Sequence, residues 1–99
     1  MKPLTVIAIT RAVAGQEQAL RSAQQQLVAE TLKEPGCLRY ELHQSLQDPG
    51  LLVFVESWQS EEYWRAHMEG TAMRRFIDSG ARQLIEKLDL HRMQEVTDD

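Results

Sequence analysis

The 99-residue sequence contains one cysteine, three histidines and no asparagine. Because Cys37 has no second cysteine to pair with, neither an internal disulfide nor a thiolate zinc site is expected. His43, His67 and His91 are far apart in the sequence, unlike the closely spaced ligands of helical metal sites, so no metal site is predicted. The five glycines are isolated from one another, which argues against a glycine-rich phosphate-binding loop.

Long apolar runs and an excess of positive charge are also lacking. The apolar run Val6 to Ile9 is far shorter than the roughly 20 residues that a membrane-spanning helix needs. With 11 Lys and Arg against 15 Asp and Glu, the formal net charge is −4, which repels phosphate backbones. We therefore expect a cytoplasmic protein with no membrane or nucleic-acid partner. The length predicts a single domain, with a core from about residue 4 to 96 and an acidic tail at 97–99.

The first half of the chain has a clear hydrophobic periodicity. The β-branched residues of 4–10 predict a strand that ends near Ala12, and apolar residues three and four apart predict a helix over 16–33. Alternation predicts a strand over 38–45, with Leu38, Tyr40 and Leu42 on one face. The turn residues 48–50 and an apolar run over 51–58 complete a predicted hairpin. The predicted buried stripe of the helix consists of Ala19, Leu20, Ala23, Leu27, Val28 and Leu32.

The second half predicts one interrupted helix and a last strand. Ser60 is a suitable N-cap for a short helix ending at Met68, and a further helical stretch is expected from about Ala72 to Leu88, before a strand over 90–96. The resulting β-α-β-β-α-β order is the ferredoxin-like α+β fold, with both helices on one face of the sheet. Because the other face is left uncovered, we predict a homodimer formed through it.

Aromatic and titratable residues gather in one segment, 56–67. Strand alternation places Glu56 beside Trp58, and helical spacing places Tyr63 and His67 on one stripe, with Trp64 next to it. These residues and Phe76 are compatible with an ordinary small core. They are equally compatible with an apolar cavity that carries a few polar groups, which is how small-molecule sites are generally built.

A series of short motifs recurs in a recognisable order and spacing: Glu34-Pro35-Gly36-Cys37, Tyr40, Asp48-Pro49, Glu56-Ser57-Trp58 and His67. With these motifs the chain resembles the antibiotic biosynthesis monooxygenase family from Leu4 to about Met93. The resemblance implies a dimeric α+β barrel and a cofactor-independent oxidation of a quinol or polyphenol by O2, with neither metal nor flavin.

Three tasks follow for such an enzyme: it binds a flat aromatic, promotes proton removal and keeps water from the intermediate. His67 is the candidate proton acceptor, because imidazole titrates near neutral pH. Trp58 and Trp64 are candidates for stacking on the substrate. Tyr40 and Tyr63 are candidates for orienting the substrate through a hydroxyl, and Phe76 for lining its pocket. Glu56 is a candidate for substrate binding and for holding a His or Arg in place.

The sequence also departs from the family pattern. Many relatives carry a second histidine five residues after the first, where this chain has Ala72. The haem-degrading branch uses an Asn of the first strand together with a Trp and a His of the second helix. This chain has no Asn and has His67 and Ile77 at the helical positions, so haem degradation is not expected.

Two other functions fit the same fold. One is an isomerase acting on a phosphorylated signalling sugar, which would require inward-pointing cations among Arg39, Arg65, Arg74 and Arg75. The other is a non-catalytic small-ligand-binding or stress protein that has kept the barrel without the chemistry.

Overall fold

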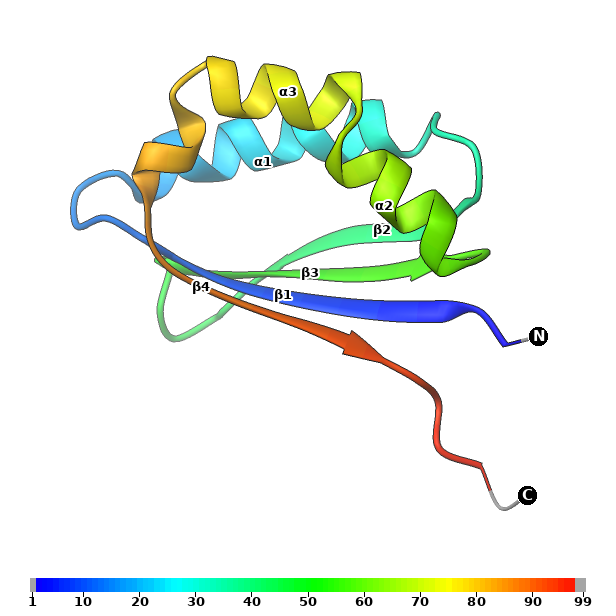
Figure 1. Ribbon diagram of the computed structural model, residues 1–99. Coiled ribbons are helices and arrows are strands. Elements are labelled where there is room, and N and C mark those ends of the chain that lie inside the picture. Colours follow the sequence, from blue (N-terminus) through cyan, green and yellow to red (C-terminus); the bar gives the residue numbers. More distant parts are fainter. Residues whose placement is uncertain (1, 98–99) are drawn as a thin grey trace.

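A computed structural model describes residues 2–97. Four strands form one antiparallel sheet in the order β2-β3-β1-β4, and the helices lie together on one face of it (Figure 1). The predicted ferredoxin-like α+β fold is confirmed. Its elements are β1 (Leu4–Ala12), α1 (Glu17–Thr31), β2 (Cys37–Gln44), β3 (Leu51–Trp58), α2 (Glu61–Met68), α3 (Thr71–Asp78), the 3-10 turn η1 (Ala81–Leu84) and β4 (Ile85–Met93).

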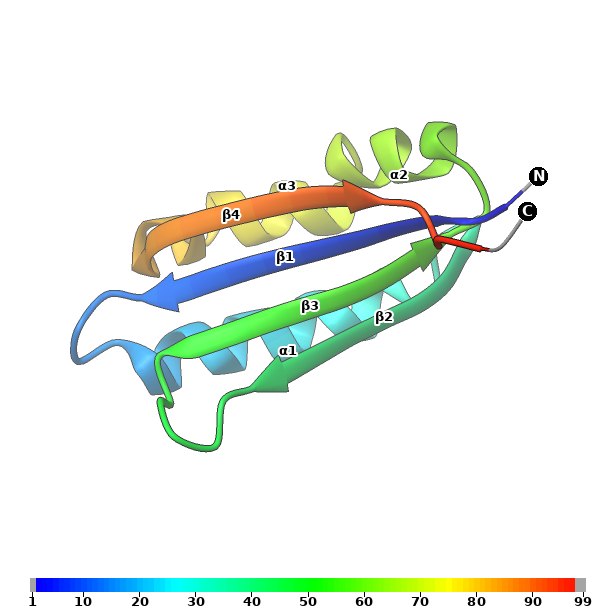
Figure 2. The ribbon, with the colours of Figure 1, turned by 90° about the horizontal axis from the view of Figure 1, so that it is seen from below.

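The central strands β1 and β3 present alternate residues to the helices. On β3 the buried residues are Leu52, Phe54, Glu56 and Trp58, as the alternation predicts. The opposite face of the sheet carries no helix (Figure 2). Its centre is apolar and only partly buried, and is formed by Ile7, Ile9, Val53 and Val55.

Helix α1 buries a different stripe from the predicted one. Leu20 and Leu27 are buried, but so are Gln24 and Thr31, whereas Leu32 is 53% exposed. The buried positions follow steps of three and four residues, and Leu32 is one residue beyond the last of them, turned about 100° away around the helix axis. Counting apolar residues could not identify the polar members of this stripe.

A β-bulge corrects the predicted face of Leu38. Cys37 is paired with Trp58 and Arg39 with the adjacent Ser57, which leaves Leu38 without a partner on β3. The extra residue reverses the alternation at the start of β2. Leu38 is therefore 58% exposed, and Cys37 packs against the core in its place.

The predicted long second helix is wrong at its end. Helix α3 stops at Asp78, and Gly80 takes a left-handed backbone (φ 87°) before η1. Strand β4 begins at Ile85, so that Leu88 lies in the sheet opposite Thr10. Apolar residues at 84, 85, 88 and 90 fit a helical and a strand period almost equally well, and pairing with β1 decides for the strand.

Two smaller expectations concern helix and chain ends. Ser60 occupies the predicted N-cap position of α2 with an extended backbone, but its side chain makes no capping hydrogen bond. Within the predicted tail, the Thr97 hydroxyl accepts a hydrogen bond from Lys2 Nζ at 2.9 Å, and Asp98 and Asp99 lie outside the described residues. Among residues 2–97, no helix is long and apolar enough to cross a membrane.

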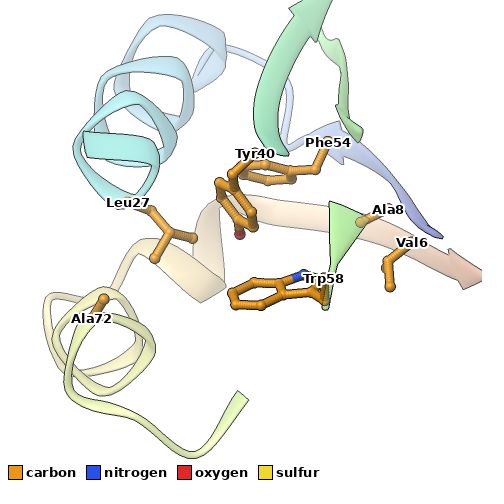
Figure 3. Close-up of a cluster of buried hydrophobic side chains, with 7 residues drawn as sticks. All are labelled: Val6, Ala8, Leu27, Tyr40, Phe54, Trp58 and Ala72. Atoms are coloured by element: carbon orange, nitrogen blue, oxygen red, sulfur yellow. The ribbon is translucent and has the colours of Figure 1, made fainter. Parts of the chain in front are cut away.

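The main core lies between the sheet and the helices, where Tyr40, Phe54 and Trp58 meet (Figure 3). The Tyr40 and Phe54 ring centroids are 5.2 Å apart, and those of Tyr40 and Trp58 are 6.2 Å apart in an edge-on arrangement. Leu27 and Ala72 close this group from the helix side. The aromatic packing fixes the positions of side chains that also border a cavity.

Candidate functional site

A cavity of about 250 Å³ lies between the helix-covered face of the sheet and helices α1 to α3. Most of its wall is aliphatic, aromatic or methionine side chain, and on the open side Leu88 and Leu90 of β4 stay partly exposed. Such a wall suits a flat apolar ligand. The polar residues that line it are Thr10, Gln24, Tyr40, Glu56, His67 and Arg82.

His67, on α2, is 3% exposed and is held by Glu34 from the loop that follows α1. Its Nδ1 lies 2.7 Å from Glu34 Oε1. A carboxylate oxygen only accepts hydrogen bonds, so Nδ1 carries the ring proton and donates a hydrogen bond to Glu34. In the neutral ring, Nε2 is then left with a free lone pair.

The lone pair of Nε2 faces the Tyr40 hydroxyl at 3.4 Å. The imidazole also packs on the Trp58 ring, with centroids 4.8 Å apart, and edge-on against the Tyr40 ring at 5.3 Å. The ring orientation of His67 is therefore fixed by one hydrogen bond to a carboxylate and by two aromatic neighbours. An acceptor held in this way can take a proton from a hydroxyl in the cavity.

Burial sets the protonation states of this cluster. Burial lowers the pKa of His67 below its ordinary value, and the Glu34 carboxylate offsets the effect only in part. The imidazole is thus neutral near pH 7 and able to accept a proton. Burial raises the pKa of Tyr40 far above its ordinary value, so its hydroxyl remains a hydrogen-bond donor.

Glu56 is a second titratable group in the cavity wall. The carboxyl is 4% exposed and accepts a hydrogen bond from Trp58 Nε1 at 2.9 Å. Burial raises the pKa of Glu56 to about 7, against the opposing effect of the Trp58 hydrogen bond. The predicted juxtaposition of carboxylate and indole on one strand face is confirmed, and it places a carboxyl that exchanges protons near neutral pH beside the cavity.

The structure brings together four of the sequence-predicted site residues: Tyr40, Glu56, His67 and Phe76 all line the cavity. Trp58 is fully buried outside the lining, where its ring contacts His67 and its N–H binds Glu56. This location suits a positioning role better than stacking on a substrate.

Two predicted aromatic residues of α2 stand elsewhere. Trp64 packs against the core under the guanidinium of Arg92, which lies 5.9 Å from the ring centroid. Tyr63 is partly exposed and covers Gly36, where any side chain would collide with the Tyr63 ring. Neither Trp64 nor Tyr63 lines the cavity.

Sequence reasoning did not anticipate that Glu34 binds His67 or that Gln24 and Arg82 line the cavity. Glu34 stands in the Glu-Pro-Gly-Cys motif that carries the family resemblance, but its partner His67 is 33 residues away in the sequence. Gln24 belongs to the run of three glutamines in α1 and shows no distinctive signal. Gln24 lies four residues after Leu20 and three before Leu27, on the same buried face of the helix. This spacing is the one feature of the sequence that indicates its burial.

The four arginines that an isomerase would need do not face the cavity. Arg39, Arg65 and Arg75 are exposed and paired with Glu41, Glu61 and Glu30, respectively. Arg74 is also exposed. The exposure of all four rules out the isomerase expected from them, and Arg82, which borders the cavity, is itself exposed. Among residues 2–97, no group of three or more His, Cys, Asp or Glu is arranged to hold a metal ion.

Comparisons with known proteins agree on the fold. A crystal structure of the protein PA3566 from Pseudomonas aeruginosa is 30% identical and superposes with a TM-score of 0.91, over 98% of this chain and 97% of that one. A crystal structure of an antibiotic biosynthesis monooxygenase is 25% identical, with a TM-score of 0.87 over 95% and 99% of the two chains. A conserved protein from Methanosarcina mazei shares the fold at 23% identity and a TM-score of 0.87, over 97% and 95%.

Family membership rests on the sequence itself. No curated protein matches the chain. The family model described as antibiotic biosynthesis monooxygenase matches residues 3–79, which include β1, α1, the β2–β3 hairpin, α2 and α3. That range contains His67, its partner Glu34 and the cavity carboxyl Glu56. The chain belongs to the antibiotic biosynthesis monooxygenase family.

Proposed function

We propose that the protein is a monooxygenase that oxidises a planar phenol or quinol with O2 inside the cavity, without a metal or flavin, using His67 as the proton acceptor. The observation that carries this proposal is the fixed imidazole: its Nδ1 is bound to Glu34, and its Nε2 faces the Tyr40 hydroxyl in an apolar cavity. The family membership supports an oxygenase reaction.

The reaction begins with removal of the phenolic proton by His67 Nε2. The electron-rich phenolate gives one electron to O2, and the two radicals combine to form a bond between a ring carbon and oxygen. Loss of the hydrogen from that carbon, with cleavage of the O–O bond, yields a quinone and one molecule of water. One oxygen atom enters the product, and the phenolic proton and the carbon-bound proton leave as water, so that atoms and electrons balance.

Each polar group near Nε2 has a task in this scheme. The Glu34 carboxylate stabilises the imidazolium that forms when His67 accepts the proton. The Tyr40 hydroxyl, which lies 3.4 Å from Nε2, turns from Nε2 to the phenolate oxygen and donates a hydrogen bond to it. Glu56, with its pKa raised to about 7 by burial, can take the carbon-bound proton and pass it to the departing oxygen. An aromatic substrate that fills the apolar cavity displaces water from the site of the radical pair.

A single imidazole is sufficient for this sequence of steps. Ala72, where many relatives carry a second histidine, is buried in the core beside Leu27 and Trp58 and offers no polar group. One proton leaves the phenol, and one acceptor takes it. We therefore assign to His67 alone the role that a pair of histidines would share.

The active form is proposed to be a homodimer joined through the uncovered face of the sheet. The partly buried, apolar centre of that face, formed by Ile7, Ile9, Val53 and Val55, is what a second copy would cover. A C2 dimer places the same patch on both copies, so it needs no further partner. The cavity lies on the opposite side of the sheet and stays open in such a dimer.

The test is O2 uptake by chelator-treated protein offered a panel of quinols and hydroxylated polycyclic aromatics. Uptake is expected from the wild type, and to be lost in His67→Ala. The control is Glu62→Ala, because Glu62 is exposed on α2, the helix that carries His67, and does not line the cavity. Binding of the panel without uptake would favour the non-catalytic ligand-binding protein.

A further inference from the structure

A second polar site lies in the same cavity, away from His67. Gln24 of α1 is fully buried, with 0% exposure, and Thr10 of β1 is almost as deeply buried. Both line the cavity, and neither has a task in the proton transfer proposed above. Buried polar side chains in an apolar wall are costly unless something hydrogen-bonds to them.

The hydrogen bonds of this pair fix the orientation of the Gln24 amide. The Thr10 hydroxyl donates to the backbone carbonyl of Leu52 at 2.8 Å, so its one proton is already used. Thr10 Oγ1 can therefore only accept from Gln24, whose Nε2 lies 3.1 Å away. The amide nitrogen of Gln24 points at Thr10, and the amide oxygen points elsewhere.

Gln24 Oε1 has no hydrogen-bond partner among the residues that the structure describes. An acceptor left unpaired in this way destabilises the protein relative to one that is satisfied. Because Gln24 lines the cavity, a ligand that fills the cavity is the candidate donor from outside the chain. The missing partner must be a hydrogen-bond donor, because a carbonyl oxygen only accepts.

The sheet register gives the separation between the two polar ends of the cavity. Tyr40 is opposite Glu56, Glu56 is opposite Val6, and Thr10 is four residues further along β1. Four residues of a strand extend about 13 Å. Between the two ends, the floor of the cavity is formed by Ala8 and Phe54, which are also paired with each other. A ligand that reaches both ends has a flat apolar body and a polar group at each end.

We propose that Gln24 Oε1 accepts a hydrogen bond from a second hydroxyl of the substrate, at the end remote from His67, so that the cavity selects fused-ring phenols hydroxylated at both ends. Which hydroxyl reacts rests on the function proposed above. The Gln24 contact is a binding preference and exists whether or not oxidation takes place.

The experiment compares three naphthalenes that differ only at one end. 2,6-Dihydroxynaphthalene carries a donor there, 6-methoxy-2-naphthol carries only an acceptor, and 2-naphthol carries neither. Their dissociation constants are measured without O2, from the change in tryptophan fluorescence. Wild-type protein is expected to bind the diol about tenfold more tightly than the other two, the ratio for one well-made buried hydrogen bond.

Gln24→Met keeps the length of the side chain and removes both amide atoms, so the tenfold preference should disappear. The matched control Gln25→Leu, at an exposed position of the same helix, should retain it. Thr10→Val provides a second variant of nearly the same shape. With no hydroxyl to anchor the amide, Gln24 can turn its nitrogen into the cavity, and the methoxy compound should then gain affinity relative to 2-naphthol.

Equal binding of the diol and 2-naphthol by the wild type would overturn the proposal, because it would mean that water satisfies Gln24 Oε1. A preference for the diol that survives in Gln24→Met would also overturn it. If Gln24→Met fails to fold, Thr10→Val decides the question. The proposal is overturned if the relative affinities of the three compounds are the same in Thr10→Val as in the wild type. A Gln24-dependent preference for the diol without O2 uptake would support the Gln24 contact and overturn the proposed oxidation. O2 uptake without the preference would support the oxidation and overturn the Gln24 contact.

Discussion

Replacing Glu56 by Gln should stabilise the protein in a pH-dependent manner. The substitution keeps an oxygen that can accept the hydrogen bond from Trp58 Nε1, and it removes the group that must be ionised in a buried site. Burial raises the pKa of Glu56 from its ordinary value of 4.5 to about 7. The folded protein therefore holds on to the proton more strongly than the unfolded chain does.

The sign and size of the effect follow from linkage. Because the folded pKa is the higher one, the wild type has its full stability below pH 4.5 and loses stability as the pH rises toward 7. One pKa unit corresponds to about 1.4 kcal/mol, so the ionised carboxyl lowers the free energy of unfolding by about 3 kcal/mol above pH 7. Gln carries no charge at any pH and escapes this loss.

Urea unfolding followed by tryptophan fluorescence, from pH 4.5 to 8.5 at one protein concentration, measures the difference. Glu56→Gln should match the wild type near pH 4.5 and exceed it by about 3 kcal/mol at pH 8. Glu95→Gln, at an exposed position outside the helices and strands, controls for the loss of one negative charge. A constant difference between Glu56→Gln and the wild type across this range would refute the reasoning, since it would mean that the Glu56 carboxyl is well solvated.

Two further predictions concern the contact between Glu34 and His67 and the proposed dimer. Glu34→Gln should lower O2 uptake about 5- to 30-fold, because a neutral amide stabilises the imidazolium by about 1 to 2 kcal/mol less than a carboxylate does. The same substitution should move the acid limb of the pH–rate profile to lower pH, because in the wild type Glu34 opposes the lowering of the His67 pKa by burial. An acid limb that does not move would contradict the pairing of Glu34 with His67. Glu30→Gln, which removes a carboxylate paired with Arg75, is the control. Val55→Lys should convert a dimer into a monomer in sedimentation velocity, because it places a charge at the apolar centre of the uncovered sheet face. A wild type that sediments as a monomer would exclude this dimer.

Hydrophobic periodicity predicted the structure correctly where it fits only one type of secondary structure. The alternation of residues 51–58 placed Glu56 and Trp58 on one buried face, and the structure confirms it with a direct hydrogen bond. Residues 85–88 fit two periods, and their assignment to a helix failed because the strand is chosen by pairing with β1. Leu38 failed for a related reason, because a bulge of one residue reverses the alternation and leaves no mark in the composition.

The cavity shows a similar division. Its position near His67, Tyr40, Glu56 and Phe76 could be anticipated from strand and helix faces, which bring these residues to the space between sheet and helices. Trp58 could be placed on that face, but its complete burial depends on what packs over it.

The sequence by itself determined the order of the elements, the ferredoxin-like plan and the faces of the central strands, because these depend on residue type and on spacing within one element. Only the tertiary structure decided that Glu34 binds His67 across 33 residues and that the Gln24 oxygen stays unpaired in the wall of the same cavity. Both depend on the distances and angles between side chains from different elements, and no period along the chain encodes these.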